Sequence, residues 1–96
     1  MNKIKISGLD YTVNFKNNED MGGLIGTADF NKQEININTS HTAQTKQIAI
    51  FHEILHLLSD SYGIHLTEEE VKIITHSFVA LLRDNPTLVT DIFSVE

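Results

Sequence analysis

The sequence contains no cysteine, which excludes both disulfide bonds and thiolate metal ligands. Any metal site in this chain must therefore be built from nitrogen and oxygen donors. A chain without cysteine also suits a reducing compartment, where disulfides rarely persist, so we expect a cytoplasmic protein.

Basic residues are few, because 7 Lys and Arg stand against 13 Asp and Glu, giving a formal net charge of -6. This charge repels phosphate backbones and anionic lipid surfaces, so we expect neither nucleic acid nor a membrane as a partner. Long apolar runs are also missing: no segment approaches the ~20 apolar residues that span a bilayer. Residues 1–16 alternate polar and apolar side chains, unlike a signal peptide.

Alternating apolar residues predict strands in the first part of the chain. Apolar side chains occupy every second position at Ile4 and Ile6 and again from Leu9 to Phe15, with a change of phase at Ser7-Gly8. This pattern predicts two strands of a hairpin. The chain is long enough for one domain, and we expect residues 1–96 to form it.

A second hairpin is predicted from two short strand candidates, residues 24–30 and 34–38, which flank Asn31-Lys32. Together with the first hairpin, these segments predict a small N-terminal antiparallel sheet of three to four strands. Because helical patterns fill the rest of the chain, the expected class is α+β, with the sheet packed on the helices.

Two helices are predicted after the strands. Residues 43–62 contain no proline or glycine and carry apolar residues at helical spacing; Thr39 or Ser40 would cap the start and Gly63 the end. Thr67, followed by three glutamates, predicts a capping box and a second helix over residues 68–83. The apolar tail from Thr87 onward is expected to dock on the domain.

The sequence His52-Glu53-Ile54-Leu55-His56 lies in the middle of the first predicted helix. Histidines at i and i+4 project from one face, so two imidazole nitrogens can reach one zinc ion (Zn2+). Glu53 is angled toward a metal-bound water, where a carboxylate can act as general base. The alternative is a pair of partly buried histidines with a solvated glutamate, which the Leu- and Ile-rich neighbourhood disfavours.

A catalytic zinc site needs a third protein ligand, and the second helix offers four candidates. A helical wheel places Glu68 beside an apolar stripe of Val71, Ile74, Phe78 and Leu82, which favours Glu68 as the ligand. Glu70 lies at the other edge of the stripe and is the next choice. His76 and Glu69 project on the far side, toward solvent. All three acids are also explained by helix capping alone.

These motifs and their order resemble gluzincin-like metallopeptidases of the ImmA/IrrE type, and most closely their short phage and prophage relatives. In that family the next helix begins with a metal-binding Glu in an E-x-x-A-N-x-F-A-like pattern. The corresponding positions here are Glu68, Val71, Lys72, Ile74 and Thr75. Val for Ala and Lys for Asn depart from the pattern.

The resemblance implies a zincin-like fold and a zinc-dependent peptidase with Glu53 as its base and His52, His56 and Glu68 as its ligands. It also implies a peptide or protein substrate, such as a repressor, lying along the strand formed by residues 34–38. Two other readings remain open: a catalytically silent, zinc-stabilised protein-binding module, and a metal-free adaptor whose apolar tail is an interface.

Overall fold

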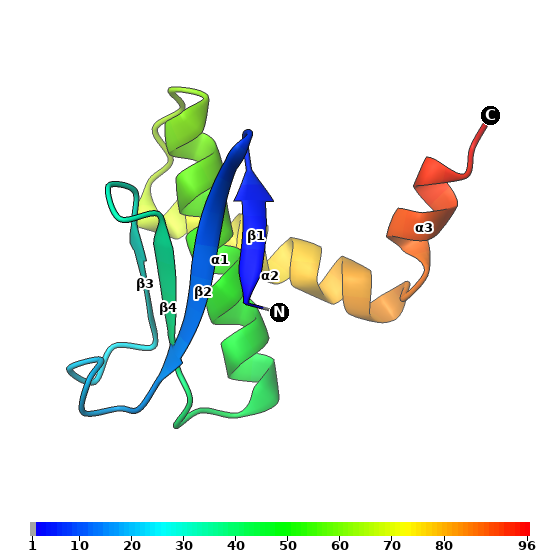
Figure 1. Ribbon diagram of the computed structural model, residues 1–96. Coiled ribbons are helices and arrows are strands. Elements are labelled where there is room, and N and C mark those ends of the chain that lie inside the picture. The colour runs from blue at the N-terminus through cyan, green and yellow to red at the C-terminus, as the bar shows by residue number, and fades with distance from the viewer. Residues whose placement is uncertain (1) are drawn as a thin grey trace.

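The computed structural model describes residues 2–96 and has an α+β fold in which four strands precede three helices (Figure 1). The expected α+β class is confirmed. Among the described helices, none is both long enough and apolar enough to cross a membrane. The strands are β1 (Lys3–Ile6), β2 (Leu9–Lys16), β3 (Gly26–Asp29) and β4 (Glu34–Asn38). The helices are α1 (Ala43–Ser61), α2 (Glu68–Asp84) and α3 (Leu88–Phe93).

The sheet has the strand order β1-β2-β4-β3, and both predicted hairpins are present as antiparallel pairs. However, β2 and β4 pair in parallel, so the prediction of an antiparallel sheet is wrong and the sheet is mixed. After β2 the chain crosses to the far edge, runs back as β3, and returns as β4 in the space between them (Figure 1). Alternating apolar residues fix the buried face of a strand but not its neighbour.

Asn38 fixes the segment that crosses between β2 and β3. Its side chain is fully buried, and its Nδ2 donates to Asn18 Oδ1 at 2.8 Å and to the Leu24 carbonyl at 3.0 Å. Its Oδ1 accepts from the Ser40 N–H at 2.9 Å. Because a buried amide is costly unless its donors and acceptors are paired, this residue holds the crossing segment in one position beside the sheet.

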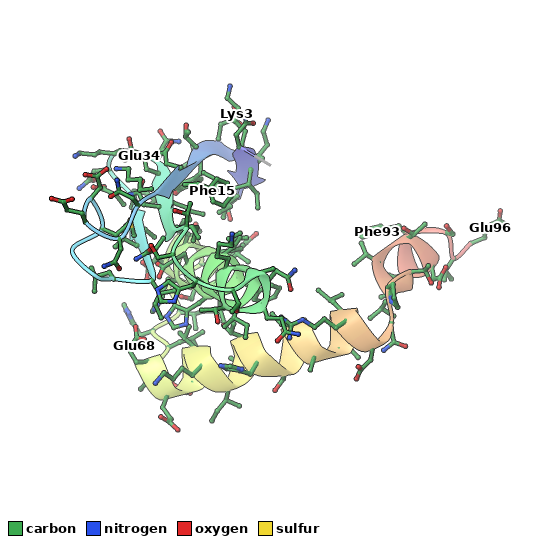
Figure 2. All side chains as sticks on the ribbon, turned by 90° about the horizontal axis from the view of Figure 1, so that it is seen from below. Lys3, Phe15, Glu34, Glu68, Phe93 and Glu96 are labelled. Atoms are coloured by element: carbon green, nitrogen blue, oxygen red, sulfur yellow. The ribbon has the colours of Figure 1, made fainter. Side chains whose placement is uncertain are left out.

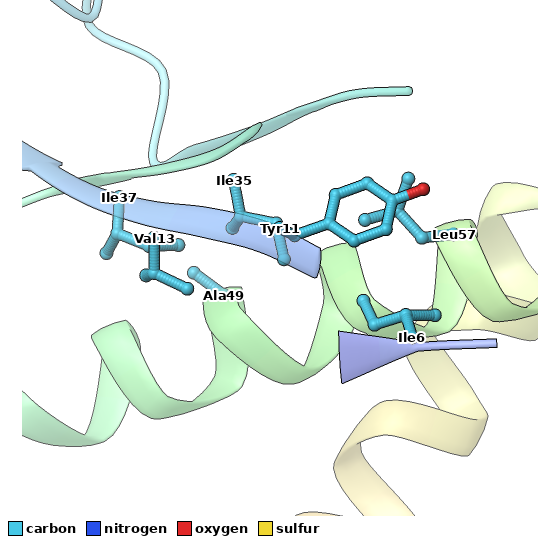
Figure 3. Packing of buried hydrophobic residues seen from close by; sticks show 7 residues of the cluster. All are labelled: Ile6, Tyr11, Val13, Ile35, Ile37, Ala49 and Leu57. Carbon is cyan, nitrogen blue, oxygen red and sulfur yellow. The ribbon is translucent and has the colours of Figure 1, made fainter. Parts of the chain in front are cut away.

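The core lies between one face of the sheet and α1. Tyr11, Ile35 and Ile37 are almost fully buried and pack with Ala49 and Leu57 of α1 (Figure 3). The opposite face is polar: Asn36 accepts from Asn14 Nδ2 and donates to Thr27 Oγ1, both at 3.2 Å. α2 packs on the side of α1 away from the sheet, so the expectation that the sheet packs on both helices is wrong and the layers are sheet, α1 and α2 (Figure 2).

The helix ends follow local capping, with one correction. Thr42 caps α1 by accepting from the Thr45 N–H at 3.2 Å, so the expected cap at Thr39 or Ser40 is wrong. Thr39 instead donates its hydroxyl to the Lys16 carbonyl at 3.1 Å, which keeps it beside the sheet. Gly63 follows α1 with φ 66°, a left-handed conformation that suits the predicted glycine stop.

The C-terminal tail does not dock on the layers, contrary to expectation. α2 carries the chain away from the sheet, and α3 projects beyond its end (Figures 1 and 2). Ile92, Phe93 and Val95 are 56%, 85% and 78% exposed. The last turn of α2 still contacts the start of α1, where Arg83 Nη2 donates to the Gln44 carbonyl at 3.3 Å and to Gln47 Oε1 at 3.0 Å, and α3 follows beyond this contact.

Candidate metal centre

The two histidines of the motif lie on the face of α1 that meets the start of α2. His52 and His56 are one helical turn apart, and their Nε2 atoms are 3.2 Å from each other. Both side chains are partly buried, being 21% and 28% exposed. The two ring nitrogens therefore converge on one point, as the i, i+4 spacing predicts.

Glu68 is the first residue of α2, where Figure 2 labels it, and its carboxylate faces both histidines. Its Oε1 is 2.8 Å from His56 Nε2, and its Oε2 is 3.4 Å from His52 Nε2. The position of α2 is set by the buried Val71 and Thr75 and by a stacked pair of rings, Phe51 and Phe78, with centroids 6.0 Å apart. The tertiary packing therefore brings the favoured third residue to the two histidines.

The donor atoms of His52, His56 and Glu68 all lie within 4.8 Å of one another, so this group could hold a metal ion. A tetrahedral zinc ion with bonds of ~2.0–2.1 Å keeps neighbouring donors about 3.4 Å apart. The closest pairs of donors are separated by 2.8 to 3.4 Å, which is near this value. Two imidazoles and one carboxylate are also a zinc donor set that leaves a fourth position open.

The other candidates for the third ligand are placed differently. Glu70 Oε1 accepts from the Thr67 N–H at 2.8 Å, completing the predicted capping box. This backbone hydrogen bond lowers the pKa of Glu70. In the described part of the chain, neither Glu69 nor His76 joins a group that could hold a metal. Glu69 is exposed, whereas His76, although also exposed, lines a cleft beside His52.

Burial sets the protonation of the motif. Burial lowers the pKa of His52, and the neighbouring His56 lowers it further. This favours the neutral imidazole, the form that binds metals. Burial also raises the pKa of Glu53; Glu68 adds to this rise, and His56 opposes it. Within residues 2–96 the Glu53 carboxylate has no hydrogen bond or ion pair, so it is free to accept a proton from a ligand.

A cleft of about 610 Å³ opens beside His52 and Glu53. Its apolar wall combines the segment before β3 with the first half of α1. The apolar residues of this wall are Leu24, Ile25, Ile48 and Ala49. Lys72 and His76 of α2 line the cleft as well. Apolar walls with a few convergent polar groups are typical of ligand sites.

The edge of the sheet at the cleft is β3, and the expectation that residues 34–38, which form β4, would border the cleft is wrong. β4 has β2 on one side and β3 on the other, so its backbone cannot accept an added strand. β3 is an edge strand that packs on α1, and its first residue, Gly26, lines the cleft. The sequence could not reveal this exchange, because it depends on how the two hairpins dock.

Gly26 is a residue of the site that sequence reasoning missed. A Cβ atom at this position would lie 3.4 Å from Glu53 Cγ and 3.5 Å from Ala49 Cβ. A single Cβ would therefore fit in ordinary van der Waals contact, whereas a larger side chain at this position would crowd Glu53. A glycine inside a predicted strand was the one local signal that another element lies close to it there.

Comparison with known protein families, curated proteins and solved structures finds no match to this chain. The resemblance drawn from its motifs therefore stays a prediction.

Proposed function

We propose that this chain is a zinc-dependent, zincin-like peptidase of the gluzincin kind. His52, His56 and Glu68 would hold the zinc ion, and Glu53 would be the general base. The observation that carries the proposal is the convergence of three zinc-type donors from two helices, next to an unpaired carboxylate that lines the same cleft as His52.

A bound zinc ion would lower the pKa of its water to about 7 and polarise the carbonyl under attack. The chain supplies the proton transfer. Glu53 takes the proton from the attacking water and then gives it to the leaving amine as the peptide bond breaks. Burial first of all raises the pKa of Glu53 in the metal-free protein, which makes its carboxylate a stronger base, and a bound zinc ion would act in the opposite direction.

The substrate class follows from the edge of the sheet. The free edge of β3 offers backbone hydrogen bonds to an extended peptide, which would place its scissile bond near Glu53. Side chains of the peptide would enter the apolar part of the cleft. We propose a cytoplasmic peptide or protein substrate and, from the resemblance to phage and prophage relatives, a repressor-type protein as its first candidate.

The test is a joint measurement of metal and turnover. Protein purified without added metal or a histidine tag is analysed by mass spectrometry, and a mixed peptide library is then incubated with it. We expect about one zinc per chain and peptide cleavage that stops with a chelator and returns with zinc. Stoichiometric zinc without any cleavage would favour the silent protein-binding module. Failure to take up zinc after reconstitution would reject both.

Gly26→Val is expected to reduce peptide cleavage while leaving zinc bound. The new side chain would press on Glu53 and displace the carboxylate, because a Cβ alone already reaches contact distance. A displacement of about 1 Å can cost about 100-fold in rate. Zinc content and kcat/KM are the two measurements.

The matched control is Thr27→Val, which adds a valine to the same strand on its polar face, where Thr27 Oγ1 accepts from Asn36. This variant should retain cleavage. Equal loss of cleavage in both variants would show that the effect comes from the strand as a whole and not from contact with Glu53.

A further inference from the structure

Among the residues that the structure describes, Lys72 is the one basic side chain in the cleft other than histidine, and the proposed hydrolysis does not use it. It lies one turn after Glu68 on α2, where a glutamate at i would normally pair with a lysine at i+4. Here the Glu68 carboxylate faces His52 and His56 instead. Among residues 2–96 Lys72 forms no ion pair, so its ammonium group is available to a ligand.

With zinc bound, the positive charge of Lys72 would have no neutralising carboxylate left in the metal site. A zinc ion would bring two positive charges, which ionised Glu53 and Glu68 would neutralise. Lys72 would then add one positive charge at the α2 side of the cleft, and His76 lines the cleft one turn further along. Neither Glu69 nor Glu70, the other acids at the start of α2, lines the cleft, so the ammonium group of Lys72 would attract an anionic group there.

We propose that Lys72, with His76 beside it, binds a carboxylate of the substrate close to the scissile bond. This inference depends on the proposed peptidase function and assigns its substrate preference. The apolar wall would take a neighbouring aliphatic or aromatic side chain, and the flexible lysine would pair with the carboxylate as a point charge. An acidic side chain and a free C-terminus present the same chemistry.

The binding test uses the zinc-loaded Glu53→Gln variant, which should hold peptides without cleaving them. Two pairs of fluorescently labelled peptides are compared. The peptides of the first pair differ only in having Glu or Gln at one central position, and those of the second pair differ only in having a free or an amidated C-terminus. Fluorescence anisotropy gives the affinities. We expect one carboxylate peptide to bind about tenfold more tightly than its neutral match, and the pair that differs identifies the source.

Substitutions at Lys72 then assign the preference to its charge. Lys72→Met should remove the preference, Lys72→Glu should reverse it, and Lys72→Arg should keep it. Lys32→Met is the control, because it removes the same charge from the exposed turn between β3 and β4, outside the cleft. It should leave the preference unchanged.

The inference is overturned if carboxylate and neutral peptides bind equally, if none binds, or if Lys72→Met keeps the preference. Its failure is separable from that of the peptidase proposal. Wild-type protein that cleaves neutral and acidic peptides with equal kcat/KM would overturn the carboxylate site alone. Carboxylate-selective binding by a wild type that cleaves nothing would support Lys72 and reject the peptidase.

Discussion

Replacing Glu53 with glutamine is expected to abolish peptide hydrolysis without removing zinc. Glutamine has the size of glutamate but cannot take a proton from water, so the loss should be about 100- to 10,000-fold in kcat. Zinc should stay, because Glu53 is not among the three converging donors. Zinc content by mass spectrometry and cleavage rate on one peptide are measured side by side.

The Glu53→Gln variant must be shown to fold, and the raised pKa of Glu53 predicts that the substitution does not reduce the stability of the metal-free protein. The folded state raises the pKa of Glu53, chiefly through burial. A raised pKa in the folded state means that ionisation of the carboxyl costs stability as the pH rises through that pKa. Metal-free Glu53→Gln should therefore unfold at pH 7 at a temperature equal to or above that of the wild type.

Ionisation of Glu53 also predicts the pH dependence of hydrolysis. Glu53 must be ionised to act as a base, so kcat/KM should fall on the acidic side as its carboxylate takes up a proton. Burial raises the pKa of Glu53 in the metal-free protein, and a bound zinc ion would lower it again. The control is Glu69→Gln, the same chemical change at an exposed residue of α2, which should keep both zinc and activity. Substantial cleavage by Glu53→Gln would rule out this residue as the base.

Replacing Glu68 with glutamine is expected to remove zinc from the purified protein. The carboxylate of Glu68 is the only group from α2 that converges on the histidines in the described residues. Substitutions that merely support a ligand cost about 10- to 100-fold in metal affinity, so loss of a ligand should exceed that. The matched control is Glu70→Gln, which removes the capping carboxylate two residues away and should keep zinc.

Thermal unfolding gives a second and independent readout. Zinc held by both α1 and α2 stabilises the folded chain by mass action, by about 2.7 kcal/mol at 100 times its dissociation constant. For a domain of this size, that corresponds to a rise of about 10–20 °C in the unfolding midpoint. Glu68→Gln should lose this rise, measured by differential scanning fluorimetry with and without zinc.

Glu70→Gln should behave differently in the same experiment. Its midpoint without zinc should change little, because the amide oxygen of glutamine can still accept from the Thr67 N–H in the capping box, and zinc should raise the midpoint as in the wild type. Stoichiometric zinc in Glu68→Gln would show that a residue other than Glu68 is the third zinc ligand. Loss of zinc in Glu70→Gln, with zinc retained in Glu68→Gln, would reverse their roles.

The sequence alone determined the elements that depend on neighbours along the chain. Alternating apolar residues located β1 and β2, and the positive φ angles of Ser7 and Gly8 suit the tight turn that joins them. The capping box at Thr67 located the start of α2. The spacing of His52 and His56 fixed their shared face, because one helical turn sets it.

Helix rotation was predicted less well. The helical wheel predicts that the apolar stripe of α2 is its buried face. The residues that are buried are instead Val71, Thr75 and Val79. Phe78, which belongs to the stripe, is half exposed. The apolar stripe was misleading because a threonine occupies a buried position. The actual rotation turns Lys72 and His76 toward the cleft, where the wheel had placed His76 in solvent.

Only the tertiary structure decided how the elements combine. The parallel pairing of β2 with β4 makes β3 the edge strand beside Glu53, since the docking of two hairpins depends on contacts far apart in sequence. The packing of α2 on α1 brings Glu68 to the histidines, which periodicity could favour but not place. The direction of α2 also leaves α3 outside the core, because an apolar tail docks only where a surface lies within its reach.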